Sequence, residues 1–172
     1  RGHTVHGIEL SPAMVDQLRK KPGGDTLPVT IGDMATTRLD QTFSLVFLVF
    51  NTICNLTTQD QQVACFRNAA AHLEVGGHFV IETFVPPLQS LPLGETRLVF
   101  DDGPEHRGED EIDIATQRLT SHHQWVREEG VVSRSFTFRY VWPSELDLMA
   151  RIAGLKRVQR WENWDRTPFT AT

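Results

Sequence analysis

The sequence predicts an α/β fold that is followed by an antiparallel extension. The first half alternates short apolar strands with helices, which is the order of a parallel sheet with crossover helices. The second half contains two long stretches of alternating apolar and polar residues, which indicate an antiparallel hairpin. At 172 residues the chain suits one domain with a small appendage. We expect an α/β core over residues 1–84, a loop and hairpin insertion over 85–142, and a helix and strand completing the core over 143–172.

The first two predicted strands flank a helix. Residues 5–9 form a short apolar strand, and Ser11 followed by Pro12 is a typical helix start. Met14, Val15 and Leu18 share one face of this helix, which we expect to end near residue 21, before a proline and two glycines. Residues 27–31 form the second predicted strand.

The next three elements continue the same order. Residues 43–50 are the most hydrophobic segment and do not alternate, which predicts a strand buried on both faces. Residues 58–73 carry an apolar stripe at helical spacing, and residues 78–84 follow as a strand.

The second half begins with a region, 88–108, that we expect to be rich in loops. Residues 112–125 and 131–142 alternate around a predicted turn at Glu129 and Gly130, which indicates a long hairpin. A helix is predicted from Pro143 to Gly154, and a last strand over 155–164.

The composition excludes several classes of protein. With 22 Asp and Glu against 17 Lys and Arg, the net charge of −5 disfavours a nonspecific nucleic-acid binder. The longest apolar run covers residues 45–50, far short of the ~18 residues that a membrane span needs. Two cysteines do not make a secreted disulfide framework, and we expect a cytoplasmic protein.

Polar side chains follow three of the predicted strands. Ligands of open α/β sheets bind at the carboxyl ends of the strands. Glu9 could accept hydrogen bonds from a ribose diol, or serve as a helix-start carboxylate. Asp33 could accept from an adenine amine beside Met34, or close an Asx turn. Asn51 could orient the ligand or cap its loop.

The motifs together resemble those of the class I S-adenosylmethionine-dependent methyltransferases. Residues 7–15 resemble the motif after the family's second strand, and Gly32-Asp33-Met34 resembles its adenine-contacting motif. Residues 43–47 with Asn51-Thr52 resemble its fourth strand, and residues 72–80 its fifth. The resemblance implies a Rossmann-like sheet with helices on both faces.

The same resemblance implies a cofactor and a reaction. S-adenosylmethionine would be the methyl donor and S-adenosylhomocysteine the product, with an amine or hydroxyl of a small molecule as acceptor. Glu9 would hold the ribose hydroxyls and Leu10 would pack against adenine. Asp33 and Met34 would contact the amine edge of adenine, and Asn51 would face the crevice.

One part of the family pattern is not in the sequence. The family's first strand and glycine-rich loop would precede Arg1, and the family places that strand in the middle of its sheet. Each buried backbone group left unpaired there would cost roughly 1–3 kcal/mol. We therefore expect a fragment of a larger enzyme, or a sheet that a homodimer or another chain completes.

Other chemistries have weaker support. The segment from Asn51 to Cys54 lacks the Pro-Pro-aromatic motif of enzymes that methylate nucleic-acid bases or glutamine. His106 shows no metal-binding spacing, so no metal is expected. His122 and His123 point to opposite faces of a strand, so they cannot act together as a base, and no catalytic residue is assigned. An NAD-dependent oxidoreductase and a non-catalytic interaction module remain alternatives.

Overall fold

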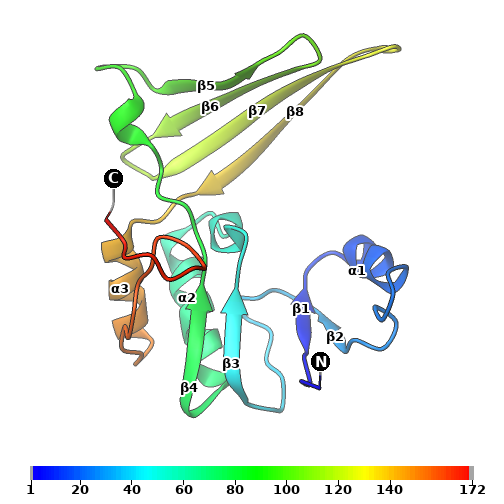
Figure 1. Ribbon diagram of the computed structural model, residues 1–172, viewed down its shortest axis with the longest axis vertical. Helices are drawn as coiled ribbons and strands as arrows, with labels where there is room; N and C mark the ends of the chain where they lie inside the picture. Colours follow the sequence, from blue (N-terminus) through cyan, green and yellow to red (C-terminus); the bar gives the residue numbers. More distant parts are fainter. Residues whose placement is uncertain (1, 171–172) are drawn as a thin grey trace.

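The computed structural model describes residues 2–170, and its first half has the predicted order of strands and helices (Figure 1). Arg1 at the start of the predicted core, and Ala171 and Thr172 at its end, lie outside the described residues. The elements of the first half are β1 (Gly7–Glu9), α1 (Pro12–Arg19), β2 (Val29–Ile31), β3 (Phe43–Leu48), α2 (Gln59–Ala71) and β4 (Leu73–Ile81).

The parallel strands form two separate pairs. β1 pairs with β2 and β3 pairs with β4, both in parallel, and within residues 2–170 neither pair is hydrogen-bonded to the other. In Figure 1 the strands lie in the order β4, β3, β1, β2, so the break falls between β3 and β1. The family resemblance predicts a further strand at this position.

All three predicted helix starts are confirmed. The Ser11 hydroxyl accepts a hydrogen bond from the Met14 amide at the start of α1. Thr58 and Gln61 form a reciprocal capping box at the start of α2, which satisfies two otherwise free amides. α1 ends at Arg19, two residues earlier than predicted, and buries none of its residues.

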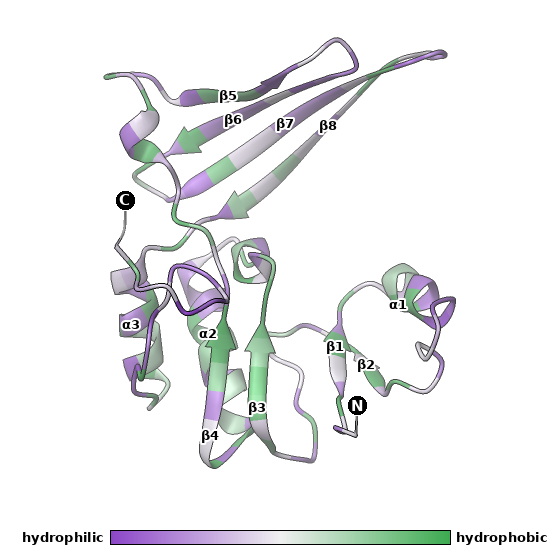
Figure 2. Ribbon diagram, in the orientation of Figure 1, coloured by the Kyte–Doolittle hydropathy of each residue, from purple (hydrophilic) through white to green (hydrophobic). Residues whose placement is uncertain are grey.

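The larger core lies between α2, α3 (Pro143–Ile152) and one face of the β3–β4 pair. Phe66 of α2 packs edge-on against Phe79 of β4, with ring centroids 5.2 Å apart. The apolar colouring of β3 and of the end of β4 is clear in Figure 2. The prediction that the segment 43–50 is buried on both faces is wrong: Leu45 and Phe47 are 50% and 54% exposed. Their side chains occupy the face opposite to α2 and α3, which no helix covers within the described residues.

The second half is richer in strands than predicted. β5 (Arg97–Asp102), β6 (His106–Asp113), β7 (Arg118–Arg127) and β8 (Gly130–Arg139) form an antiparallel sheet in that order. The predicted turn is confirmed between β7 and β8, just before Gly130, whose φ of 127° favours glycine. The predicted first arm over 112–125 is wrong at its start, because β6 ends at Asp113 and β7 begins only at Arg118. The predicted loop over 88–108 is wrong, since β5 and the start of β6 lie there. These strands are joined by charged pairs such as Arg97 with Glu109, which give no apolar alternation.

The predicted last strand is also wrong. Within residues 2–170 the segment after α3 has a single isolated bridge, between Trp161 and Pro168. Arg160 instead donates hydrogen bonds to the Pro143 carbonyl and to Asp147, which fold the segment back onto α3.

Candidate active site

The carboxyl ends of β1 and β2 bring Glu9 and Asp33 together. The Gly32 amide donates to the Glu9 carbonyl at 3.0 Å, so the two strand ends lie side by side. Oε1 of Glu9 accepts from the Ser11 amide at 2.8 Å, and Oδ1 of Asp33 accepts from the Ala35 amide at 2.7 Å. Glu9 therefore acts as a carboxylate at the start of α1, and Asp33 closes an Asx turn. Within residues 2–170 the second oxygen of each carboxylate has no hydrogen bond, so each can still accept one from a ligand.

Leu10 and Met34 differ in how firmly the protein holds them. Leu10 is 70% exposed at the end of β1, so its side chain is available to a ligand. Met34 packs against the larger core beside Ala35. A ligand at these strand ends would therefore meet one exposed apolar side chain and one that is packed against the core.

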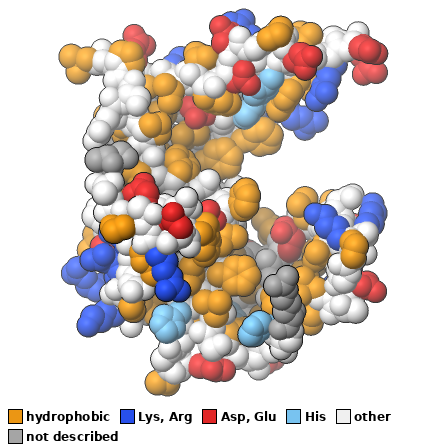
Figure 3. Space-filling model, viewed as in Figure 1, with side chains coloured by type: hydrophobic (Ala, Val, Ile, Leu, Met, Phe, Trp, Pro, Cys, Tyr) orange, Lys and Arg blue, Asp and Glu red, His pale blue; other side chains and the backbone are white. Residues whose placement is uncertain are grey.

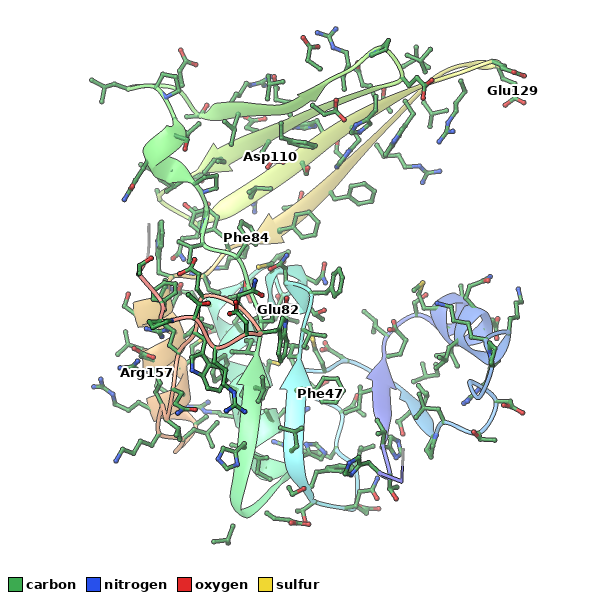
Figure 4. All side chains as sticks on the ribbon, in the orientation of Figure 1. Phe47, Glu82, Phe84, Asp110, Glu129 and Arg157 are labelled. Atoms are coloured by element: carbon green, nitrogen blue, oxygen red, sulfur yellow. The ribbon has the colours of Figure 1, made fainter. Side chains whose placement is uncertain are left out.

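Asn51 links the ends of β3 and β4. Its Oδ1 accepts from the Phe84 amide at 2.7 Å, and Glu82 accepts from the Phe50 amide at 3.0 Å. Phe50 and Asn51 both have left-handed backbones, with φ of 59° and 56°. Figure 4 shows Glu82 and Phe84 at the end of β4, with Asp110 on β6 above them. Asn51 thus fixes the loop after β3 against the end of β4, and it also lines a pocket.

A pocket of about 290 Å³ lies between these strand ends and the antiparallel sheet. Figure 3 shows the molecule hollowed there, with hydrophobic side chains on both sides. Oδ1 of Asp110 is buried and has no hydrogen-bond partner within the described residues. The lining residues are Phe50, Asn51, Cys54, Asn55, Phe84, Asp110, Leu119, Ser121 and Phe138.

Of this lining, the sequence indicated Asn51 at the strand ends, and Phe138 among the aromatic residues that could line an acceptor pocket. Asp110 and Ser121 face the pocket because they lie opposite each other in the β6–β7 register. The start of β6 was predicted as loop, so the pairing of Asp110 with Ser121 could not be predicted from the sequence.

Cys54 is a packing residue. It is 1% exposed, and burial raises the pKa of its thiol, although a contact with Thr83 and the charge of Arg139 act the other way. A neutral buried thiol is a weak nucleophile.

Among residues 2–170, no three His, Cys, Asp or Glu side chains gather in a way that would hold a metal ion. The same residues include no helix with the length and apolar character to cross a membrane.

The chain is similar to known methyltransferases. A family model described as "Methyltransferase domain" matches residues 1–77. Over 76 residues the chain is 38% identical to dTDP-3-amino-3,4,6-trideoxy-alpha-D-glucopyranose N,N-dimethyltransferase of Streptomyces venezuelae. This match covers 44% of the chain and 31% of that relative, so it spans about a third of the relative's length.

Two solved structures resemble the whole chain. The CcbJ methyltransferase from Streptomyces caelestis has a TM-score of 0.84 and 35% identity, over 99% of this chain and 71% of that one. An S-adenosylmethionine-dependent methyltransferase from Clostridium acetobutylicum has a TM-score of 0.77 and 14% identity, over 97% and 70% of the two chains. The second likeness concerns the fold alone. Both include the antiparallel sheet, which therefore belongs with the α/β part.

Proposed function

The chain belongs to the class I S-adenosylmethionine-dependent methyltransferases, and from this premise we propose that it takes part in methyl transfer to an amine of a small molecule. The pocket between the ends of β3 and β4 and the antiparallel sheet carries this proposal, because it can hold an acceptor and is bordered by Asn51, one of the residues proposed for the cofactor. S-adenosylmethionine, the family's cofactor, supplies an electrophilic methyl group. Holding reactants in line is the main task of the protein in such a reaction.

We propose that five residues hold the cofactor: Glu9, Leu10, Asp33, Met34 and Asn51. The free carboxylate oxygens of Glu9 and Asp33 suit the hydroxyls of a ribose and the amine of an adenine. Leu10 is exposed beside them and can cover an apolar ring. Asn51 borders the acceptor pocket, so it would lie toward the reacting end of the cofactor.

An amine is favoured over a hydroxyl as acceptor. Oδ1 of Asp110 is a buried hydrogen-bond acceptor without a partner, to which the N–H of an amine or the O–H of a hydroxyl can donate, so the preference for an amine rests on the similar enzymes. Phe50, Phe84 and Phe138 surround this oxygen with apolar surface, and a volume of about 290 Å³ suits part of a small molecule. The similar Streptomyces venezuelae enzyme is named for an amino sugar, which supports a sugar amine as the acceptor class.

We also propose that a further strand fills the space between β1 and β3. Within residues 2–170, no strand pairs with β1 on the side that faces β3, and Leu45 and Phe47 of β3 are about half exposed. Both observations support this proposal. A second copy or another polypeptide could supply the strand. Sedimentation velocity over a range of concentrations would detect a self-supplied strand as a dimer, and a monomer at all concentrations would exclude it.

A cytoplasmic location remains a proposal. Its support is that Cys54 and Cys65 are both free thiols and both buried. Free thiols persist in reducing compartments.

The cofactor proposal is tested by calorimetry with S-adenosylhomocysteine. We expect binding that weakens about tenfold in Asp33→Ala and in Glu9→Gln, since each loses one charged hydrogen-bond acceptor. Asp16→Asn is the matched control, because Asp16 is an exposed acid on α1, away from the strand ends. Equal affinity in all four proteins would exclude this site. Displacement of the ligand by NAD would instead support the oxidoreductase alternative, and binding without any methyl transfer would support the non-catalytic one.

A further inference from the structure

Four polar side chains on the antiparallel sheet form a continuous chain of hydrogen bonds. Oδ2 of Asp101 lies 2.7 Å from Nδ1 of His106, and Nε2 of His106 lies 2.9 Å from Nδ1 of His123. Nε2 of His123 lies 3.1 Å from Oγ of Ser121. This series of hydrogen bonds therefore runs across β5, β6 and β7 and ends at Ser121, which lines the acceptor pocket.

The carboxylate of Asp101 fixes the direction of this chain. The hydrogen bond from His106, then one from the Gly103 amide, holds the pKa of Asp101 below its ordinary value. An ionised carboxylate only accepts hydrogen bonds. With both rings neutral, His106 must donate from Nδ1, His123 must donate from Nδ1 to His106, and Ser121 must donate to Nε2 of His123. The lone pairs of the Ser121 oxygen are then free to accept a proton from the pocket.

Packing holds the two imidazole rings in this arrangement. The His123 ring is stacked on Trp125 with centroids 5.2 Å apart and an interplanar angle of 3°. Its other contacts are the His106 ring at 5.2 Å and the edges of Phe100 and Phe136. Rings held on several sides keep a fixed orientation, which proton transfer requires.

The neighbouring His122 lies on the other face of the same strand. It bonds Ser135 at 2.8 Å and approaches Glu111 at 3.4 Å, away from the pocket. The two adjacent histidines thus have separate partners, which makes His122 a matched control for His123.

We propose that Ser121, His123, His106 and Asp101 form a proton relay that accepts the proton released by the amine during methyl transfer. This inference rests on the function proposed above and names the groups that complete its chemistry. Ser121 touches the acceptor, and the other three act through it as positioning and proton-accepting residues.

The nitrogen lone pair forms the new N–C bond, the S–C bond breaks, and its electron pair stays on sulfur, which becomes a neutral thioether. The amine proton passes to Oγ of Ser121 as the Ser121 proton passes to Nε2 of His123. The Nδ1 proton of His123 passes to Nε2 of His106. His106 becomes an imidazolium beside Asp101, whose charge balances it until the proton leaves to solvent.

The relay predicts a defined tautomer for each ring, which can be measured without any ligand. Long-range ¹H–¹⁵N spectra of the ¹⁵N-histidine-labelled chain, recorded at a pH where both rings are neutral, should show the proton of His106 and of His123 on Nδ1. Asp101→Leu should shift both rings toward mixed tautomers, and His122→Gln should leave both unchanged. A wild-type His123 protonated on Nε2 would overturn the relay, as would an Asp101→Leu spectrum identical to wild type.

Kinetics separate this proposal from the proposed function. With S-adenosylmethionine and dTDP-3-amino-3,4,6-trideoxyglucose as the probe acceptor, Ser121→Ala and His123→Gln should lower kcat about 100-fold with little change in KM. Ser121→Thr keeps a hydroxyl and should restore most of the rate, and His122→Gln should match wild type. If the wild type transfers the methyl group and Ser121→Ala does so with the same kcat, the relay is overturned while the proposed function stands. An inactive wild type would instead count against the proposed function, while the tautomers still decide the relay's geometry.

Discussion

Arg139 at the end of β8 and Glu145 on α3 form an ion pair with an N–O distance of 2.7 Å, and their side chains are only 5% and 17% exposed. Arg139 also donates to Gln62 of α2 and, at 2.9 Å, to Gln117. Gln62 in turn donates to the Arg139 carbonyl at 3.0 Å. These bonds join the antiparallel sheet to the two helices of the larger core and so hold one wall of the acceptor pocket in place.

Replacing Arg139 should be strongly destabilising. In Arg139→Met the carboxylate of Glu145 stays buried without its cation, which typically costs about 3–5 kcal/mol. The free energy of unfolding from urea titrations would measure the loss. Arg107→Met is the matched control, because Arg107 pairs with Asp102 at 2.9 Å while both are 67% exposed, and exposed pairs contribute at most about 1 kcal/mol. Similar losses in the two variants would contradict the role given to Arg139.

The same pair should make stability depend on acid pH. Burial alone would raise the pKa of Glu145, but hydrogen bonds from Arg139 and Gln117 and the Arg139 charge outweigh it and lower the pKa below the ordinary value. A lowered folded-state pKa stabilises the fold above the unfolded-state pKa of roughly 4.3, and this is lost as pH falls through the folded-state pKa. The stability difference between wild type and Glu145→Gln should therefore be constant near neutrality and shrink below about pH 4. A difference that grows with acid would have the wrong sign.

We expect Phe50 to serve ligand binding while its backbone conformation lowers the stability of the fold. It is 87% exposed and has a left-handed backbone, which disfavours a side chain by about 1–2 kcal/mol. Glycine relieves this but loses about 0.5–1 kcal/mol in chain entropy, so Phe50→Gly should be neutral or up to about 1 kcal/mol more stable. Phe47→Gly, in the extended strand β3, should instead lose about 1 kcal/mol or more. Urea unfolding of both variants checks this, and a large loss in Phe50→Gly would refute the strain argument.

Both cysteines should be inert in the folded protein. Burial, with a smaller contribution from the charge of Asp33, raises the pKa of Cys65 to about 12, and burial raises the pKa of Cys54 as well. Thiol reagents attack the thiolate, so native protein at neutral pH should react slowly and unfolded protein should give two equivalents. Rapid labelling of one thiol in the native state would mean that Cys54 is reached through the pocket.

The sequence predicted best those features that depend on neighbouring residues. Ser11 with Pro12 and Thr58 with Gln61 begin helices through contacts within one turn, so their patterns carry the information directly. The turn before Gly130 is local in the same sense. The strand ends that carry Glu9 and Asp33 could also be located, because each follows an apolar run.

Features that depend on register could not be predicted. Gly108 has no room for a side chain because Phe100 crosses above it, a contact across two strands. His106 and His123 are 17 residues apart and meet only because β6 and β7 pair in one register. The strand predicted after α3 does not form. The apolar residues there make other contacts: Trp161 bridges to Pro168, and the indole N–H of Trp164 donates to Glu82.

The break between the two strand pairs also bears on how the molecule unfolds. The part that contains β1, α1 and β2 is tied to α2 mainly through the segment after β2, where the Asn68 amide donates to the Met34 and Thr37 carbonyls at 2.7 and 2.9 Å. With α1 burying no residue, little apolar surface couples this part to the rest. It should therefore open as a separate cooperative unit, with amides of β1 and β2 exchanging with solvent well before those of β3 and β4. Glu9 and Leu10 of the proposed cofactor site lie on that unit, so ligand affinity would include the free energy of closing it.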